Sequence, residues 1–196
     1  MARTQAADYD RKRETITNHA ARMFARQGFS GASISEIAAS CKVSKSLIYH
    51  YYSSKEDILF DVMNEHMEAL LGVTQPSAND ETASNPQEQF KHLTRALLRC
   101  YTGAAHRQKV LLYELDNLPK KNREEIIAKQ RTVIERFENA LSAIDPAVRN
   151  DKSQLRAKIM LFFGMLNWSH TWFKSSGDIS RDELADMASE TLLKSL

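Results

Sequence analysis

The 196-residue sequence has few of the residues that interrupt helices, with only six Gly and four Pro. A sheet-rich chain needs more of them for its turns, so helices are the expected default. The sequence also lacks any apolar run near the roughly 18 residues that a membrane span needs. Its first residues are polar and unlike a signal peptide. We therefore expect a cytoplasmic protein without a membrane partner.

The short motifs of metal binding and catalysis are absent as well. The two cysteines, Cys41 and Cys100, have no metal-ligand spacing, and we expect free thiols in a reducing compartment. There is no phosphate-binding loop and no nucleophile elbow. The scattered residues Glu114, Asp116, His106 and His170 form no recognisable metal or acid–base set. We predict no cofactor, no metal site and no enzymatic activity.

Positive charge is concentrated at the N-terminal end of the chain. Residues 1–55 contain nine Lys and Arg against four Asp and Glu, a net charge of +5, and the remainder carries −3. A basic segment joined to a mildly acidic body is expected when only that segment meets nucleic-acid phosphates.

Apolar periodicity and capping residues predict four helices in the N-terminal part of the chain. The first covers 11–27 and ends at Gly28, and Ser33 opens the second with a capping box that includes Glu36. Ser44 and Ser54 are placed to cap the third and fourth helices. Capped starts this close together predict short helices and tight turns, the pattern of a helix-turn-helix.

Five further helices are predicted in the body of the chain. They cover about 86–103, 106–117, 121–143, 155–173 and 180–193. The polar segment 74–85 has no periodicity and is predicted to be a loop. The fold expected is therefore all-α, with about nine helices and no strand.

Four segments in the N-terminal part closely resemble the DNA-binding domain of TetR-family regulators. They are ARMFARQGF at 21–29, SISEIA at 33–38, VSKSLIYHYY at 43–52 and SKEDIL at 54–59. The resemblance implies a three-helix helix-turn-helix domain over residues 1–56 and a helical ligand-binding and dimerisation domain over residues 57–196. It implies a homodimeric repressor that binds a palindromic operator in double-stranded DNA and releases it when a small effector binds.

By the same resemblance, eight residues belong to the DNA interface. Those expected at base edges or nearby phosphates are Lys45, Ser46, Tyr49 and His50. Those expected at the DNA backbone are Tyr51, Lys55, Ser33 and Ser35. Packing is the alternative for Tyr49, and a solvated or packing role for His50, whereas Tyr52 is expected to pack. Lys42 replaces a glycine often found in the family's turn, so a positive φ is expected there.

A shorter resemblance concerns the effector. Segments 113–119, 129–134 and 164–173 are similar to a TetR branch that senses acyl-CoA or aryl-CoA thioesters. Such a ligand needs an apolar slot and cations for its phosphates. The slot residues expected are Tyr113, Phe162, Met165, Trp168 and Trp172, and the cations are Arg99, His106, Arg107 and Arg131.

Other interpretations of these residues stay open. The aromatic residues suit a core or an interface equally well, and the arginines suit a solvated surface. The family resemblance assigns the dimer interface to the last two helices, with Leu184, Met187, Ala188, Thr191 and Leu192 on the final one. The alternative function is a DNA-binding regulator without a small-molecule ligand, controlled by a protein partner.

Overall fold

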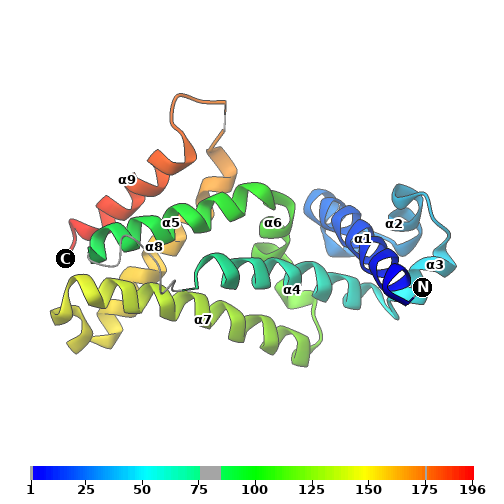
Figure 1. Cartoon of the computed structure of the whole chain (residues 1–196), viewed down its shortest axis with the longest axis horizontal. Helices are drawn as coiled ribbons and strands as arrows, with labels where there is room; N and C mark the ends of the chain where they lie inside the picture. The colour runs from blue at the N-terminus through cyan, green and yellow to red at the C-terminus, as the bar shows by residue number, and fades with distance from the viewer. Residues whose placement is uncertain (1, 76–84, 175) are drawn as a thin grey trace. The chain divides into compact units, whose positions relative to one another are not determined.

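The computed structural model describes residues 2–75, 85–174 and 176–196, with side chains from Asp8 onwards. These residues form nine α-helices and two short 3-10 helices, without a strand among them (Figure 1). The α-helices are α1 Ala2–Gly31, α2 Ile34–Cys41, α3 Lys45–Tyr51, α4 Lys55–Val73, α5 Pro86–Gly103, α6 Ala105–Tyr113, α7 Lys120–Ile144, α8 Lys152–Trp172 and α9 Arg181–Leu193. The 3-10 helices are η1 Leu115–Asn117 and η2 Pro146–Asn150. The predicted all-α fold is confirmed; residues 76–84 of the predicted loop lie outside the described residues.

The helices gather into two compact units. The first unit contains residues 1–67 and 104–127, and the second contains residues 68–103 and 128–196. α4 and α7 each contribute to both units. The division expected from the sequence, between residues 56 and 57, stays a prediction of where the DNA-binding segment ends.

The first unit is built around one face of α1. Ile16, Ala20 and Phe24 follow one another at helical spacing and are buried. α1 differs from its prediction at both ends, because it already begins at Ala2 and because Gly28 interrupts it without ending it. Gly28 adopts φ 75°, which a residue without Cβ tolerates, and the helix resumes to Gly31.

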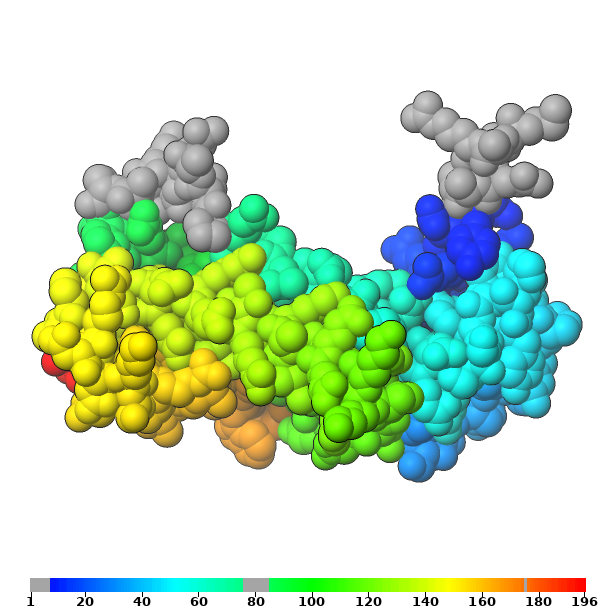
Figure 2. Space-filling view, turned by 90° about the horizontal axis from the view of Figure 1, so that it is seen from below, coloured from blue at the N-terminus to red at the C-terminus, as the bar shows by residue number. Residues whose placement is uncertain are grey.

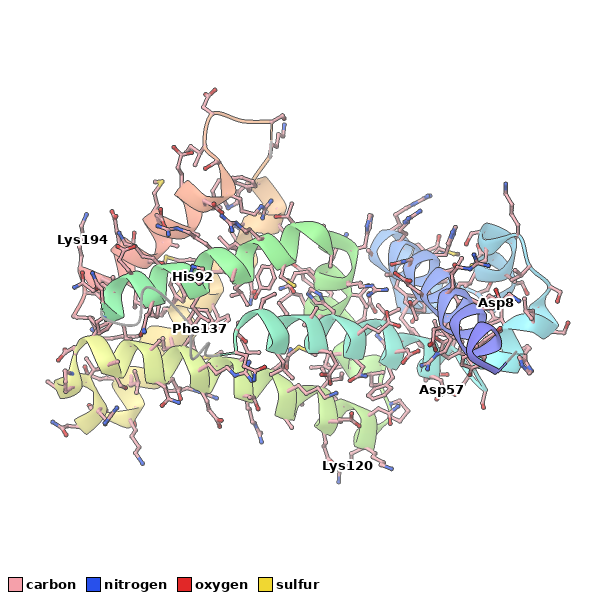
Figure 3. All side chains as sticks on the ribbon, viewed as in Figure 1. Asp8, Asp57, His92, Lys120, Phe137 and Lys194 are labelled. Atoms are coloured by element: carbon pink, nitrogen blue, oxygen red, sulfur yellow. The ribbon has the colours of Figure 1, made fainter. Side chains whose placement is uncertain are left out.

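The second unit has an aromatic core. Phe90 of α5, Phe137 of α7 and Phe162 of α8 are buried, with ring centroids 5.2–5.9 Å apart. Figure 3 labels Phe137 at this position, and Figure 2 shows the outer surface of α7 and η2 in yellow-green and yellow.

Three ion pairs fasten α9 to α5 on the surface of the same unit. They are Lys91–Glu190, Arg95–Asp186 and Arg99–Asp182. Because residue numbers rise along α5 as they fall along α9, the two helices are antiparallel. Arg95 holds Asp186 with two hydrogen bonds, at 2.6 and 2.8 Å, the bidentate geometry that suits a guanidinium.

Candidate DNA interface and effector cavity

The helix-turn-helix consists of α2, a tight turn and α3. The predicted capping box is present: the Ser33 hydroxyl accepts from the Glu36 backbone N–H at 3.2 Å, and the Glu36 carboxylate accepts from the Ser33 N–H at 2.9 Å. The Ser44 hydroxyl caps α3 by accepting from the Leu47 N–H at 3.1 Å. These caps fix where the two short helices begin.

Lys42 closes α2 in the left-handed conformation, with φ 58° and ψ 40°, which confirms the positive φ expected there. This conformation is strained for a residue with a Cβ. We expect Lys42→Gly to raise the free energy of unfolding by about 0.5–1 kcal/mol, because the relief of strain exceeds the added chain entropy. Urea denaturation measures this change. Lys42→Ala is the control, which keeps the Cβ and should bring no such gain.

α3 has a buried face and an exposed face. Ile48 is buried together with Ile37 of α2, and Tyr52 at the end of α3 is buried, as expected of a packing residue. The residues of α3 that remain exposed include Lys45, Ser46, Tyr49 and His50. The structure thus presents to solvent all four side chains that the sequence placed at base edges.

The residues expected at the DNA backbone differ in how far they are exposed. Ser33, the N-cap of α2, and Ser35 within α2 are exposed, although the Ser33 hydroxyl also serves the capping box. Tyr51 is half-buried and meets His50 edge-on, with ring centroids 5.2 Å apart. The structure therefore places these three side chains close to the exposed face of α3 or on the helix that precedes it.

The half-buried Lys55 side chain forms hydrogen bonds within the protein. Its ammonium donates to the carbonyl oxygens of Phe29 and Ala32, both at 2.8 Å, and lies 4.2 Å from the centroid of the Phe29 ring. The side chain thus satisfies backbone carbonyls at the end of α1. Its predicted contact with a DNA phosphate stays a prediction, and only the remaining N–H of the ammonium is available for it.

The beginning of α1 adds side chains that the sequence did not indicate. The Tyr9 ring lies 4.7 Å from the Tyr51 ring, centroid to centroid. The Asp8 carboxylate, labelled in Figure 3, accepts from Lys12 at 2.8 Å and from Arg11 at 3.0 Å. These hydrogen bonds, first that of Lys12, lower the pKa of Asp8. Asp8 thus holds Lys12 and Arg11 in the segment of α1 whose Tyr9 contacts Tyr51 of α3.

A network of polar side chains joins α1, α3 and α4 beneath this surface. The Tyr52 hydroxyl donates to the Asp61 carboxylate at 2.6 Å, and Arg13 donates to both Asp61 and the Tyr52 oxygen. Burial raises the pKa of Tyr52, and the hydrogen bond with Tyr52 raises the pKa of Arg13. The network fixes the C-terminal end of α3 against α4.

A second network joins α4 to α6 and α1. Arg107 of α6 forms an ion pair with Glu65 at 2.7 Å and donates to Thr17 at 3.1 Å. One residue further along each of the two helices, the His66 ring nitrogen Nε2 lies 2.7 Å from the amide oxygen of Gln108. Burial raises the pKa of Glu65 and lowers the pKa of His66. Arg107, which the sequence analysis proposed as a ligand cation, thus forms structural contacts with Glu65 and Thr17.

His66 gives the protein a pH dependence with a defined sign. Because its pKa is lowered in the folded state, the unfolded chain takes up the proton first as the pH falls through 6.5. We expect the free energy of unfolding to decrease between pH 7.5 and pH 5.5 and His66→Gln to reduce this decrease, both measured by urea denaturation. Glu65, whose pKa is raised in the folded state, increases the free energy of unfolding as the pH falls, but it is present in both proteins. An equal decrease in wild type and variant contradicts the prediction.

The second unit contains a cavity of about 300 Å³ between the end of α4, α5 and α7. Its walls are formed by Val73, Thr74, Gln75, Gln89, His92, Leu93, Arg136, Asn139, Ala140 and Ala143. Figure 3 labels His92 on α5. Arg136 donates to the Leu71 carbonyl oxygen at 2.5 Å and to the Thr74 hydroxyl at 2.9 Å. The cavity is thus partly apolar and carries a cation on its wall.

The structure does not gather the residues that the sequence assigned to an effector. Phe162 is 0% exposed in the aromatic core. Arg99 is paired with Asp182, and Arg131 is exposed on α7. His106 and Tyr113 are exposed in the first unit. None of the nine residues lines the cavity within the described parts of the chain, so their role as a ligand site stays a prediction.

Met165, Trp168 and Trp172 instead lie on an exposed apolar stripe of α8. Leu161, Met165, Trp168 and Trp172 follow one another at intervals of four, three and four residues, as on one helix face, and Met160 is exposed next to Leu161. Leu161 is 72% and Trp168 63% exposed. From α9, Met187 is exposed, whereas the buried residues of that helix include Ala188 and Leu192. Large apolar side chains that are exposed together on one helix face are typical of an interaction surface. We call the five exposed residues of α8, which are Met160, Leu161, Met165, Trp168 and Trp172, the α8 stripe.

The described residues contain neither a candidate membrane span nor a candidate metal site. None of their helices combines the length and the apolar character that crossing a membrane requires. Among the same residues, no three His, Cys, Asp or Glu side chains are grouped so as to hold a metal ion.

Two family models match the chain. Residues 16–62 match the model of bacterial regulatory proteins of the tetR family, and residues 83–196 match the model of the tetracyclin repressor-like C-terminal domain. The second model covers more than half of the chain. The first covers α2 and α3 completely.

Solved and curated proteins agree with these models. A TetR-family transcriptional regulator from Bordetella parapertussis 12822 has a TM-score of 0.84 and 38% identity, over 92% of this chain and 93% of that protein. AibR, in complex with isovaleryl coenzyme A and operator DNA, has a TM-score of 0.76 and 27% identity, over 92% and 97%. The repressor NicS of Pseudomonas putida is 27% identical over 114 residues, 58% of this chain and 52% of NicS. The chain thus matches about half the length of this curated relative.

Proposed function

Because the chain belongs to the TetR family of transcriptional regulators, we propose that it is a homodimeric repressor that binds a palindromic operator through α2 and α3. The observation that carries this proposal is the exposed face of α3 over a buried Ile37–Ile48 core. A helix presented in this way can enter a major groove. We further propose that the protein acts in the cytoplasm and has no enzymatic activity.

The residues proposed to contact DNA divide by their chemistry. Lys45, Ser46, Tyr49 and His50 reach base edges or nearby phosphates from α3. Tyr51, Ser33 and Ser35 contact the phosphate backbone, as does Lys55 through its remaining N–H. The contacts to phosphate make the affinity for all duplexes depend on salt.

The α8 stripe is the proposed dimer interface. One recognition helix reads only half of an operator, so two protomers related by a two-fold axis suit a palindrome. The exposure of Leu161 and Trp168 supports this assignment, because large apolar side chains gain free energy when a partner covers them.

Selection from a random pool of duplexes tests the proposal, because the pool contains every candidate operator sequence. We expect a palindromic sequence, bound with an affinity that falls by about 10³-fold or more between 50 and 200 mM salt. Lys45→Ala and Tyr49→Ala should weaken binding to the selected duplex. A protein that enriches no sequence and binds DNA with no dependence on salt is not such a repressor.

We propose that α1 extends the DNA contact beyond α3. Lys12 lies in the segment that Tyr9 anchors on Tyr51, so it is placed to meet a phosphate beside the recognition helix. We expect Lys12→Gln to weaken binding to all duplexes about equally and to lower the salt dependence by about one phosphate contact. Asp8→Asn should strengthen binding, because it removes the carboxylate that holds Lys12 and Arg11.

Fluorescence anisotropy with the selected operator and a scrambled duplex measures both effects. The control is Lys120→Gln on α7, an equal change of charge at an exposed position labelled in Figure 3. Unchanged affinity and salt dependence in Lys12→Gln contradict the contact. A loss confined to one operator sequence contradicts its assignment to phosphate.

The proposed effector is a small molecule, and an acyl-CoA or aryl-CoA thioester is the class suggested by the sequence. Support comes from AibR, whose complex contains isovaleryl coenzyme A together with operator DNA. We propose that effector binding weakens operator binding, so the operator must weaken effector binding by the same factor. A thermal-shift screen with CoA thioesters tests the class, since a ligand at 100 times its Kd stabilises by about 2.7 kcal/mol. Thioesters that leave both melting temperature and operator affinity unchanged rule this class out.

A further inference from the structure

The cavity of the second unit lies at the C-terminal end of α4, where Arg136 holds the helix. Leu71 belongs to the last turn of α4, whose carbonyl groups lack partners within the helix. Arg136 donates from Nη1 to the Leu71 carbonyl at 2.5 Å and to the Thr74 hydroxyl at 2.9 Å. A cation from α7 thus caps α4 and also faces the cavity.

The charge of the cavity wall is positive and uncompensated among the described residues. Both acceptors that Arg136 binds are neutral, and no lining residue is Asp or Glu. Nε and Nη2 of Arg136 donate to none of the described side chains or carbonyls. Because these two nitrogens form one edge of a planar guanidinium, they match the two oxygens of a carboxylate.

The other residues of the cavity wall indicate the chemistry of the rest of the ligand, beyond its anionic group. Leu93, Ala140 and Ala143 supply apolar surface, and Gln89, His92 and Asn139 supply polar groups. A volume of about 300 Å³ is at the small end of the range for ligand sites, which extends to about 1,000 Å³. The cavity thus suits a small molecule better than a whole CoA thioester.

We propose that this cavity binds a small organic monocarboxylate, whose carboxylate takes hydrogen bonds from Nε and Nη2 of Arg136 and whose apolar part contacts Leu93 and Ala140. The inference rests on the proposed effector response and assigns to this cavity a smaller class of effector than the CoA thioester suggested by the sequence. The bound carboxylate partly neutralises the guanidinium and so weakens its hold on the Leu71 carbonyl. α4 is the element through which this change reaches the first unit, because one continuous helix supplies residues 55–67 to it and 68–73 to the second.

Isothermal titration calorimetry on the full chain, without DNA, tests the site. The probes are isovalerate and benzoate, their neutral amides isovaleramide and benzamide, and isovaleryl-CoA. We expect at least one acid to bind, its amide to bind about 10- to 100-fold more weakly, and the CoA thioester to bind more weakly than the free acid. Two acids that give no heat at millimolar concentration, or amides that bind as well as the acids, overturn the proposal.

Variants show whether the cavity and Arg136 are responsible. Arg136→Gln should weaken acid binding by about 10- to 100-fold and leave amide binding unchanged. Arg136→Lys keeps the charge without the two-nitrogen edge and should fall between the two proteins. Ala140→Leu fills the cavity without altering its cation and should weaken acids and amides alike. Arg149→Gln, an equal change at an exposed position outside the cavity, is the control.

Each outcome decides the proposal, because folding is checked by circular dichroism and two variants retain the Arg136 cap or its charge. Acid binding that is within twofold of wild type in either Arg136→Gln or Ala140→Leu overturns it. Operator affinity is measured separately with and without the acid. If operator binding is found but no acid binds, only this inference fails; if the acid binds as predicted but no duplex is selected, the proposed repressor function fails.

Discussion

Trp168→Glu combined with Leu161→Glu is expected to convert the protein to a monomer and to weaken operator binding strongly. Both side chains are mostly exposed on the α8 stripe, so the substitutions remove an interface without opening the core. The two substitutions also place carboxylates in an apolar interface, where the loss of their hydration is unfavourable. Because the second half-site is then no longer bound as part of one molecule, operator affinity should fall by a factor of about 10² or more.

Sedimentation velocity and anisotropy measure the two effects on the same samples. The helical content and the melting transition should be retained, because neither side chain contributes to the core of one protomer. Phe162→Glu is the contrasting variant: Phe162 lies on the same helix but is fully buried, so a charge there should unfold the protein. A double variant that remains dimeric, or that binds operator as tightly as wild type, contradicts the assignment of the interface.

Asp61→Ala is expected to lower the free energy of unfolding by about 2–3 kcal/mol. The substitution leaves the Tyr52 hydroxyl buried without its 2.6 Å acceptor and leaves Arg13 without its carboxylate partner. The value is below that for a fully buried ion pair, because part of the Arg13 side chain is exposed to water. Operator affinity should decrease as well, since the network fixes the end of α3.

Tyr52→Phe is the matched control for this prediction. It removes one hydroxyl and leaves the Arg13–Asp61 pair, so the expected cost is about 1 kcal/mol. Urea denaturation of both variants, followed by circular dichroism, gives the comparison. An Asp61→Ala protein that is no less stable than Tyr52→Phe shows that the carboxylate does not organise the network.

The local parts of the fold could be predicted from the sequence because local rules determine them. The capping residues Ser33 and Ser44 lie where the structure begins α2 and α3, and the strained turn at Lys42 is present. The beginning of α1 was missed, because the segment before Arg11 is polar. Its signal was Tyr9, which precedes the buried Ile16 by two helical turns.

Features that depend on tertiary structure could not be predicted in the same way. The sequence assigned Lys55 to a DNA contact. Its hydrogen bonds to the carbonyl oxygens of Phe29 and Ala32 depend on the tertiary contact between the end of α1 and the beginning of α4. The cavity is assembled from α4, α5 and α7, and its cation, Arg136, has no sequence motif that separates it from a solvated arginine. The aromatic residues of α8 could not be divided by composition into the buried Phe162 and the exposed Trp168.

Anisotropy titration of the selected operator with wild type and with the double variant Lys45→Ala, Tyr49→Ala tests whether α3 reads the operator. The predicted result is two protomers bound per palindromic duplex, and near-complete loss of sequence preference in the variant while its dimer and melting temperature persist. Equal affinity and equal sequence preference in the two proteins would show that α3 does not read DNA and would contradict the account.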